Sequence, residues 1–137
     1  MGLELFENAR VTCREIIVTS LEVSTRTTRS ASVVTATGRI DLRTEAYWRE
    51  NIEDACAEIT TKPLMVIDLT EVTFLSIGAA PLLTRAHYHC LHRSRRLRVV
   101  VPPGPVLDTL RITGVAELVA LFRDLPTALR PVVNTPW

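Results

Sequence analysis

The chain of 137 residues has few of the features that mark several common protein classes. It has three cysteines, Cys13, Cys56 and Cys90, and their spacing matches neither a zinc site nor a redox motif. Its apolar runs are a few residues long, far below the ~20 residues that a membrane-spanning helix needs. Its formal net charge of +1 is far from the basic excess typical of nucleic-acid-binding proteins. We therefore expect no disulfide scaffold, no membrane insertion and no direct contact with nucleic acid.

The N-terminus also lacks the usual targeting signals. Residues 1–6 carry an acid, contain no apolar signal segment, and place Phe6 where a myristoylation motif requires Ser or Thr. An odd number of scattered cysteines without a signal peptide predicts reduced thiols and a cytoplasmic location. The sequence contains no catalytic triad order, phosphate-binding glycine loop or dinucleotide motif. We therefore expect a protein that is not an enzyme and that needs no cofactor.

The composition is that of an ordinary globular protein, with 47% hydrophobic and 23% charged residues. A chain of this length forms one domain with its own core. We expect an N-terminal arm over residues 1–14, a folded domain over 15–130 and a tail over 131–137.

The first half of the chain predicts a β-hairpin and a helix. Residues 15–23 and 32–37 are rich in β-branched side chains and are separated by a polar loop over 24–30. A helix is expected from Thr44, because apolar residues recur there at helical spacing. This stripe consists of Trp48, Ile52, Ala55, Cys56 and Ile59.

The central part predicts a buried strand followed by a helix. Residues 64–69 form an almost unbroken apolar run, which is typical of a strand covered on both faces. A polar turn is expected next, and then a helix that begins near Ile77 or Gly78 with Pro81 in its first turn. The buried stripe of this helix consists of Ala79, Leu82, Leu83, Ala86 and Cys90.

The last third predicts a strand over 97–101, a helix from Pro105 to Gly114, an edge strand over 118–122 and a short helix capped by Asp124. A hairpin followed by alternating helices and strands indicates an α/β fold. We expect a mixed sheet of four or five strands with helices mainly on one face. Six side chains should be buried together in its core: Trp48, Ile52, Ile67, Leu82, Leu83 and Leu110.

Three motifs occur in one order along most of the domain. Residues 38–44 read G-R-I-D-L-R-T, residues 67–74 read I-D-L-T-E-V-T-F, and residues 106–114 read V-L-D-T-L-R-I-T-G. They resemble the elements G-x-L-D-x-x-T, V-L-D-L-S-x-V-x-F and V-x-x-x-L-x-x-T-G of STAS domains, the fold of anti-sigma factor antagonists. The resemblance covers roughly residues 15–130 and implies a domain without catalysis. It also implies a partner, an anti-sigma factor with a histidine-kinase-like ATP-binding fold.

In that family the anti-sigma factor phosphorylates a serine in the segment V-T-F-I-D-S-S-G-L and so breaks the complex. Aligned with this segment, Ser76 falls on the Asp, Ile77 on the first Ser and Gly78 on the phospho-acceptor. The resemblance therefore predicts binding without the phosphorylation switch. Ser76 keeps a hydroxyl, and it serves either as a helix N-cap or as a regulatory site. The expected partner-binding residues are Asp41, Thr44, Phe74, Leu75, Ser76, Ile77 and Gly78.

Two other roles remain open for such a domain. Members of the family also act as subunits of transport systems or stress-signalling complexes, and many of these depart from the D-S-S-G sequence. A small-ligand sensor is the third alternative, because a helix N-terminus can hold an anion. The sequence does not identify the partner or the oligomeric state.

Three further groups of polar residues have simpler interpretations. His87, His89 and His92 suggest a metal site, but on a helix only His89 and His92 share a face, and a closed zinc site needs four ligands. We therefore expect no metal there. Asp41 and Asp68 both end strands and are expected to make structural hydrogen bonds. A group of arginines either attracts an acidic partner or phosphate, or complements a helix dipole. These arginines are Arg85, Arg93, Arg95, Arg96 and Arg98.

Overall fold

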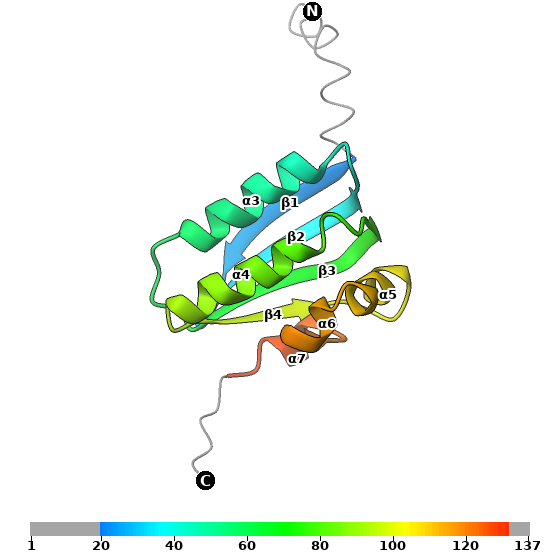
Figure 1. The fold of residues 1–137 in the computed structure, drawn as a ribbon. Coiled ribbons are helices and arrows are strands. Elements are labelled where there is room, and N and C mark those ends of the chain that lie inside the picture. The colour runs from blue at the N-terminus through cyan, green and yellow to red at the C-terminus, as the bar shows by residue number, and fades with distance from the viewer. Residues whose placement is uncertain (1–19, 132–137) are drawn as a thin grey trace, which may run out of the picture.

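The computed structural model describes residues 20–131, which form a five-stranded sheet with helices packed on it (Figure 1). The strands follow one another in space in the same order as in the chain. They are β1 (Leu21–Thr27), β2 (Ala31–Ile40), β3 (Leu64–Leu75), β4 (Arg96–Val100) and β5 (Ala120–Phe122). β1 and β2 are antiparallel, whereas the pairs from β2 to β5 are parallel. The predicted α/β fold with a mixed sheet is confirmed.

Four helices pack on one face of the sheet. They are α3 (Glu45–Ala57), α4 (Pro81–His92), α5 (Pro105–Ile112) and α6 (Val115–Leu118). The short α7 (Leu125–Ala128) packs on the other face through Ala128. Helices therefore lie mainly on one face, as predicted.

The main core lies between the sheet and the first four helices. The six side chains expected there (Trp48, Ile52, Ile67, Leu82, Leu83 and Leu110) all belong to this one cluster and are at most 6% exposed. The helical spacing of the apolar residues in α3 and α4 accounts for this result, because it directs one stripe of each helix to the sheet.

A smaller cluster lies on the opposite face and explains the apolar run in β3. Alternate residues of a strand point to opposite faces, so Met65 and Ile67 join the main core while Leu64 and Val66 join the smaller cluster. Ala128 of α7 packs in the same smaller cluster. Both faces of β3 are therefore covered, as the sequence indicated.

Three strands continue beyond their predicted ends. β1 continues to Thr27 and β2 spans 31–40, so the expected loop over 24–30 shrinks to a turn at residues 28–30. β3 continues to Leu75 through the segment that we expected to be a polar turn. Polar side chains are accommodated because they point to solvent, and the β2–β3 pairing shifts register twice along this segment. The predicted strand residues 15–19, the arm over 1–14 and residues 132–137 lie outside the described residues.

Two predictions near helix ends are wrong. Helix α3 ends at Ala57, so Ile59 falls outside the stripe and is 94% exposed. The edge strand was predicted to begin at Leu118, but Leu118 is the last residue of the short helix α6 (Val115–Leu118). Gly114 takes a positive φ of 84°, which ends α5 and turns the chain into α6, leaving three residues for β5.

Candidate partner-binding surface

The sheet brings together the predicted site residues from two distant parts of the sequence. β2 and β3 are parallel, and Arg39 pairs with Phe74 and Ile40 with Leu75 at their carboxyl ends. The backbone N–H of Ser76 donates a hydrogen bond to the carbonyl oxygen of Ile40 at 2.8 Å. The turn after β2 and the loop after β3 therefore lie side by side.

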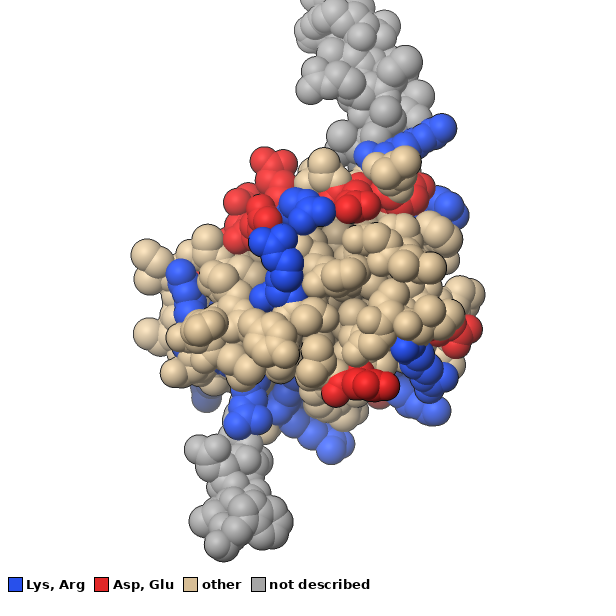
Figure 2. All heavy atoms as spheres, viewed as in Figure 1, with Lys and Arg blue, Asp and Glu red and all other residues tan. Residues whose placement is uncertain are grey.

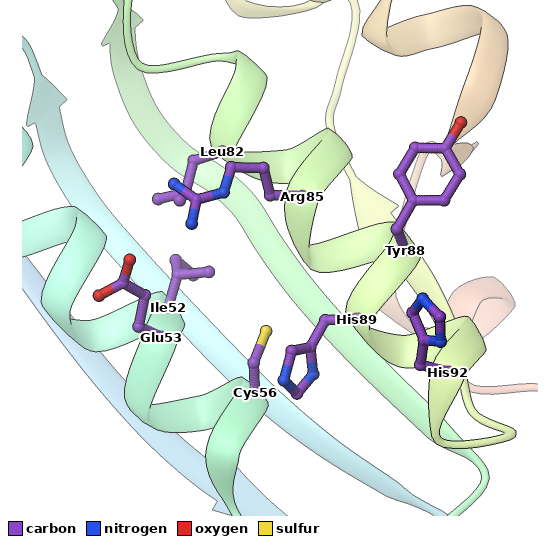
Figure 3. A pocket seen from close by; sticks show the side chains of 8 residues that line it. All are labelled: Ile52, Glu53, Cys56, Leu82, Arg85, Tyr88, His89 and His92. Atoms are coloured by element: carbon purple, nitrogen blue, oxygen red, sulfur yellow. The ribbon is translucent and has the colours of Figure 1, made fainter.

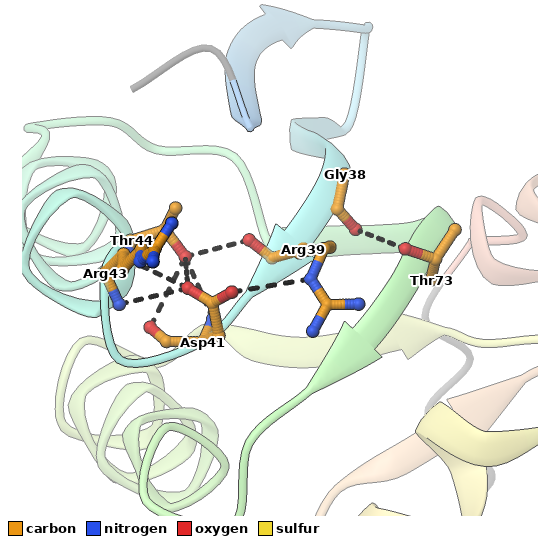
Figure 4. A network of polar contacts seen from close by, with 6 residues as sticks. All are labelled: Gly38, Arg39, Asp41, Arg43, Thr44 and Thr73. Atoms are coloured by element: carbon orange, nitrogen blue, oxygen red, sulfur yellow. Dashed lines mark hydrogen bonds and ion pairs between the residues drawn. The ribbon is translucent and has the colours of Figure 1, made fainter. Parts of the chain in front are cut away.

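A network of hydrogen bonds fixes the turn between β2 and α3 (Figure 4). Asp41 Oδ1 accepts hydrogen bonds from the backbone N–H of Arg43 at 3.0 Å and of Thr44 at 3.3 Å. The Thr44 hydroxyl donates to the Arg39 carbonyl at 2.8 Å and accepts from the Asp41 N–H at 2.9 Å. Thr44 is fully buried and so acts as an internal brace of the turn.

The charge of Asp41 is stabilised within the same turn. Burial raises the pKa of its carboxyl, but the hydrogen bonds from Arg43 and Thr44 and the nearby Arg39 guanidinium outweigh burial and leave the pKa lowered. Asp68 likewise makes local hydrogen bonds, since its Oδ1 accepts from the N–H and the hydroxyl of Thr70. Both aspartates thus make the structural hydrogen bonds that we expected.

Phe74 and Leu75 end β3 with opposite exposure. Leu75 is 2% exposed and packs in the main core, whereas the ring of Phe74 is partly exposed beneath the Arg39 guanidinium. Phe74 is therefore accessible from solvent, while Leu75 anchors the end of β3 in the main core.

Ser76 caps the turn that leads into α4. Its Oγ accepts a hydrogen bond from the Ala79 N–H at 3.2 Å, and its carbonyl oxygen accepts from Ala79 and Ala80. The prediction of Ser76 as the N-cap of the helix is wrong, because α4 begins at Pro81, not at Ile77 or Gly78, and has Ala80 at its N-cap; Ser76 caps only the preceding turn. Pro81 has no N–H, so the regular hydrogen-bond ladder cannot include it as a donor.

Gly78 is exposed, and its backbone conformation does not require a glycine. Its φ does not lie in the left-handed region, and an added Cβ would meet one atom within 4 Å, Glu45 Oε1 at 3.7 Å. Glu45 in turn forms an ion pair with Arg49 at 3.2 Å. A serine would therefore fit at position 78, but its hydroxyl would lie close to a carboxylate.

Apolar side chains project into solvent from both loops and from the end of β3. Leu42 is 87% exposed, Ile77 is 65% exposed and Phe74 is 38% exposed. Leu42 and Arg39 were not among the predicted partner-binding residues. An apolar residue in the middle of the polar turn G-R-I-D-L-R-T is the sequence signal that could have identified Leu42.

The expected group of five arginines does not form one surface patch. Arg95 is 4% exposed, and its guanidinium donates to the carbonyls of Lys62 and Leu64 and to the Ser32 hydroxyl. Arg98 donates to the carbonyls of Ala128 and Arg130. Both arginines are engaged by backbone oxygens from other elements, which their sequence neighbours could not indicate.

A groove of about 510 Å³ separates α3 from α4 (Figure 3). Ile52 and Leu82 contribute apolar side chains, while Glu53 and Arg85 extend from opposite helices. Cys56 is buried there, and burial followed by the neighbouring Cys90 raises the pKa of its thiol to about 11, so the thiol stays protonated at neutral pH.

The described part of the chain offers no metal site and no membrane span. Within residues 20–131, no three His, Cys, Asp or Glu side chains are grouped so that they could hold an ion. No helix among these residues has the length and apolar character needed to cross a bilayer.

Comparison with known proteins identifies the family. A model of the STAS domain matches residues 22–128. The chain belongs to the STAS domain family. The predicted resemblance is thereby confirmed over most of the folded domain.

Three known proteins show how similar this STAS chain is to its relatives in sequence and in fold. Rv2638 of Mycobacterium tuberculosis, provisionally named an anti-anti-sigma factor, is 26% identical over 110 residues, which are 80% of this chain and 74% of that protein. The crystal structure of an anti-sigma factor antagonist from Mycobacterium paratuberculosis has a TM-score of 0.72 at 26% identity, covering 80% of this chain and 92% of the other. The phosphorylated Bacillus cell-fate determinant SpoIIAA has a TM-score of 0.55 at 13% identity, covering 75% and 93%, and shares the fold.

Proposed function

We propose that this STAS protein is a non-catalytic cytoplasmic regulator that binds an anti-sigma factor with a kinase-like ATP-binding fold. Binding would modulate transcription that depends on the corresponding sigma factor. The names of the two mycobacterial relatives support this role. Their similarity extends over four fifths of the chain and includes the loops described above.

The observation that carries the proposal is the exposed apolar surface formed by Leu42, Phe74 and Ile77. Apolar side chains this exposed, on two adjacent loops and on the strand end between them, are typical of a surface that becomes covered by a partner. Asp41 and Thr44 hold the first loop, and Ser76 holds the second. The surface is therefore preorganised, which lowers the entropic cost of binding.

The same surface supports binding without a phosphorylation switch. Gly78 has no hydroxyl, and a phosphoserine at that position would place about two negative charges beside the Glu45 carboxylate. Arg49 already pairs with Glu45 and would have to leave it to neutralise a phosphate. We infer that the complex is controlled by the amounts of the two proteins or by another signal, and not by phosphorylation of residue 78.

The binding step can be tested with the cognate anti-sigma factor and isothermal titration calorimetry. Ile77→Asp and Leu42→Asp should each weaken binding at least about tenfold, because a carboxylate would be desolvated in an apolar contact. Ile59→Asp is the matched control, since Ile59 is 94% exposed but follows the far end of α3. Equal affinity of Ile77→Asp, Leu42→Asp and the wild type would show that the partner binds elsewhere.

The absence of the switch needs a separate experiment. The wild-type protein, incubated with the anti-sigma factor and ATP, should show no added phosphate by intact mass measurement. Ile77→Ser combined with Gly78→Ser restores the family pattern and should gain one phosphate. One phosphate on wild-type Ser76 would contradict the proposal, because it would place the switch two residues earlier.

A further inference from the structure

A second pocket of about 310 Å³ lies at the other end of the sheet, where β4 begins. It is formed by the outer side of α4, the end of α6 and the strands β4 and β5. Its lining consists of His87, Leu91, Arg96, Leu97, Arg98, Leu118, Ala120 and Phe122.

The lining has an apolar part that solvent reaches. Leu91 is 51% exposed and Leu118 is 46% exposed, while Leu97 and Phe122 lie deeper. These side chains offer a surface on which several carbons of a ligand could be removed from water.

All the charge in the lining is positive. Arg96 and Arg98 are two residues apart on one strand, so their side chains leave the same face, which is the face of α7. Leu91 and Leu118 belong to helices on the opposite face, and the pocket spans the edge of β4 where β5 does not yet pair with it. None of the eight described lining residues is acidic. Figure 2 shows basic side chains gathered along the lower edge of the molecule, below the position of β4 in Figure 1.

The two guanidinium groups differ in how they are held. Arg98 Nη1 donates to the carbonyls of Ala128 at 3.0 Å and Arg130 at 2.6 Å, and its guanidinium lies 5.3 Å from the centre of the Phe122 ring. Burial, followed by the charge of Arg96, lowers the pKa of Arg98. Among the described residues, the Arg96 side chain makes no hydrogen bond or ion pair, so an anion here would relieve the repulsion between the two arginines.

We propose that this pocket binds an amphipathic mono-anion, with its head group between Arg96 and Arg98, its first carbons on Phe122, and the rest of its chain passing the edge of β4 towards Leu91 and Leu118. A carboxylate or a phosphate ester head satisfies the charge, because guanidinium groups bind both in a bidentate manner. The volume is at the small end of the range for ligand pockets, so a short acyl chain fits it best.

This site is distinct from the surface that we propose for the anti-sigma factor. Arg96 pairs with Leu64 at the first residue of β3, whereas Phe74 lies near the last residue of that strand. The two sites therefore lie at opposite ends of the sheet, and ligand binding can be measured without any partner protein.

The test uses octanoate, titrated into the full chain by calorimetry below its micelle concentration. Octanoate should bind saturably and at least about tenfold more tightly than octanamide, because the amide has the same chain without the charge. Acetate, which has the charge without the chain, should bind more weakly than octanoate. Equal affinities for octanoate and octanamide would overturn the proposal.

Substitutions locate the site. Arg96→Gln should weaken octanoate binding about tenfold, whereas Arg93→Gln removes the same charge from a residue that is not part of the lining and should leave the affinity unchanged. Leu118→Gln should also weaken binding, and Ile112→Gln, at an exposed residue outside the pocket, should not. Equal losses for Arg93→Gln and Arg96→Gln would show general charge attraction and overturn the proposal. Circular dichroism confirms that each variant is folded.

Vesicle binding separates the two sources of such an anion. Co-sedimentation with phosphatidylglycerol vesicles but not phosphatidylcholine vesicles, lost in Arg96→Gln, would assign the site to a lipid head group. Octanoate binding without vesicle binding would assign it to a free carboxylate. Failure of both octanoate and phosphatidylglycerol to bind would overturn the proposal.

Discussion

The guanidinium carbon of Arg39 lies 4.6 Å from the centre of the Phe74 ring, and its Nε lies 3.4 Å from Asp41 Oδ2. One side chain thus connects the end of β3 to the turn that follows β2. A cation over an aromatic face at an exposed site is worth about 0.5–1 kcal/mol. This contact therefore helps to hold the Phe74 ring in place on the candidate surface.

Arg39→Met should lower the free energy of unfolding by about 0.5–1 kcal/mol, because it removes the cation over the ring. Urea unfolding of Arg39→Met, Phe74→Leu and the double variant measures the coupling between the two residues. Arg43→Met is the control, since the Arg43 side chain is exposed and makes no described contact. Strictly additive losses would indicate that the two side chains do not interact.

Gly38 should be the least replaceable glycine of the described chain. It has a φ of +121°, and an added Cβ would lie 2.1 Å from the Ser20 carbonyl oxygen, which also accepts the Arg39 N–H. Gly38→Ala should therefore cost at least about 3 kcal/mol of unfolding free energy, through backbone strain and displacement of the β1 end. Gly114→Ala isolates the cost of a positive φ, roughly 1–2 kcal/mol, because no atom lies within 4 Å of its added Cβ. Similar losses in the two variants would rule out the steric explanation.

Arg95→Met should destabilise the protein by about 2–4 kcal/mol, because the carbonyls of Lys62 and Leu64 would lose their charged donor inside the fold. Arg95→Lys should recover little, since one ammonium cannot reproduce the geometry of the guanidinium. Chemical denaturation measures both values. Arg96→Met, at the neighbouring exposed position, should change stability by less than about 0.5 kcal/mol. A loss in Arg96→Met as large as that in Arg95→Met would contradict this assignment.

Asp41 should contribute a pH-dependent part of the stability. Its pKa in the folded protein is lowered from the ordinary 3.8, so the folded state favours the charged carboxylate. The stabilisation is present above the ordinary pKa and is lost as the pH falls through the lowered value. The stability difference between the wild type and Asp41→Asn should therefore shrink from about pH 6 towards pH 2, as followed by urea unfolding. A difference that stays constant over this range would show that the charge of Asp41 is not involved.

The sequence by itself determined the elements whose side chains repeat with a regular period. The stripe of α3 from Trp48 to Cys56 and the apolar run of β3 each specify which face is buried, because helix and strand periods are local properties. The cap of α7 was also predictable, since Asp124 accepts a hydrogen bond from the Thr127 N–H three residues later. The missing phospho-acceptor could also be read from the sequence alone, because Gly78 occupies the position where the family has a serine.

Tertiary structure alone decided the features that depend on residues far apart in the chain. Strands β1 and β3 continue through polar segments because β2 supplies hydrogen bonds along their length, which a local pattern does not show. Arg95 is buried because carbonyls from residues 62 and 64 and the Ser32 hydroxyl surround it, although its sequence neighbours indicate a surface position. The same holds for Gly78, which precedes α4 and where an added Cβ would lie nearest to Glu45 of α3. Long-range contacts set burial and neighbourhood, since the packing of separate elements brings together groups that no short stretch of sequence contains.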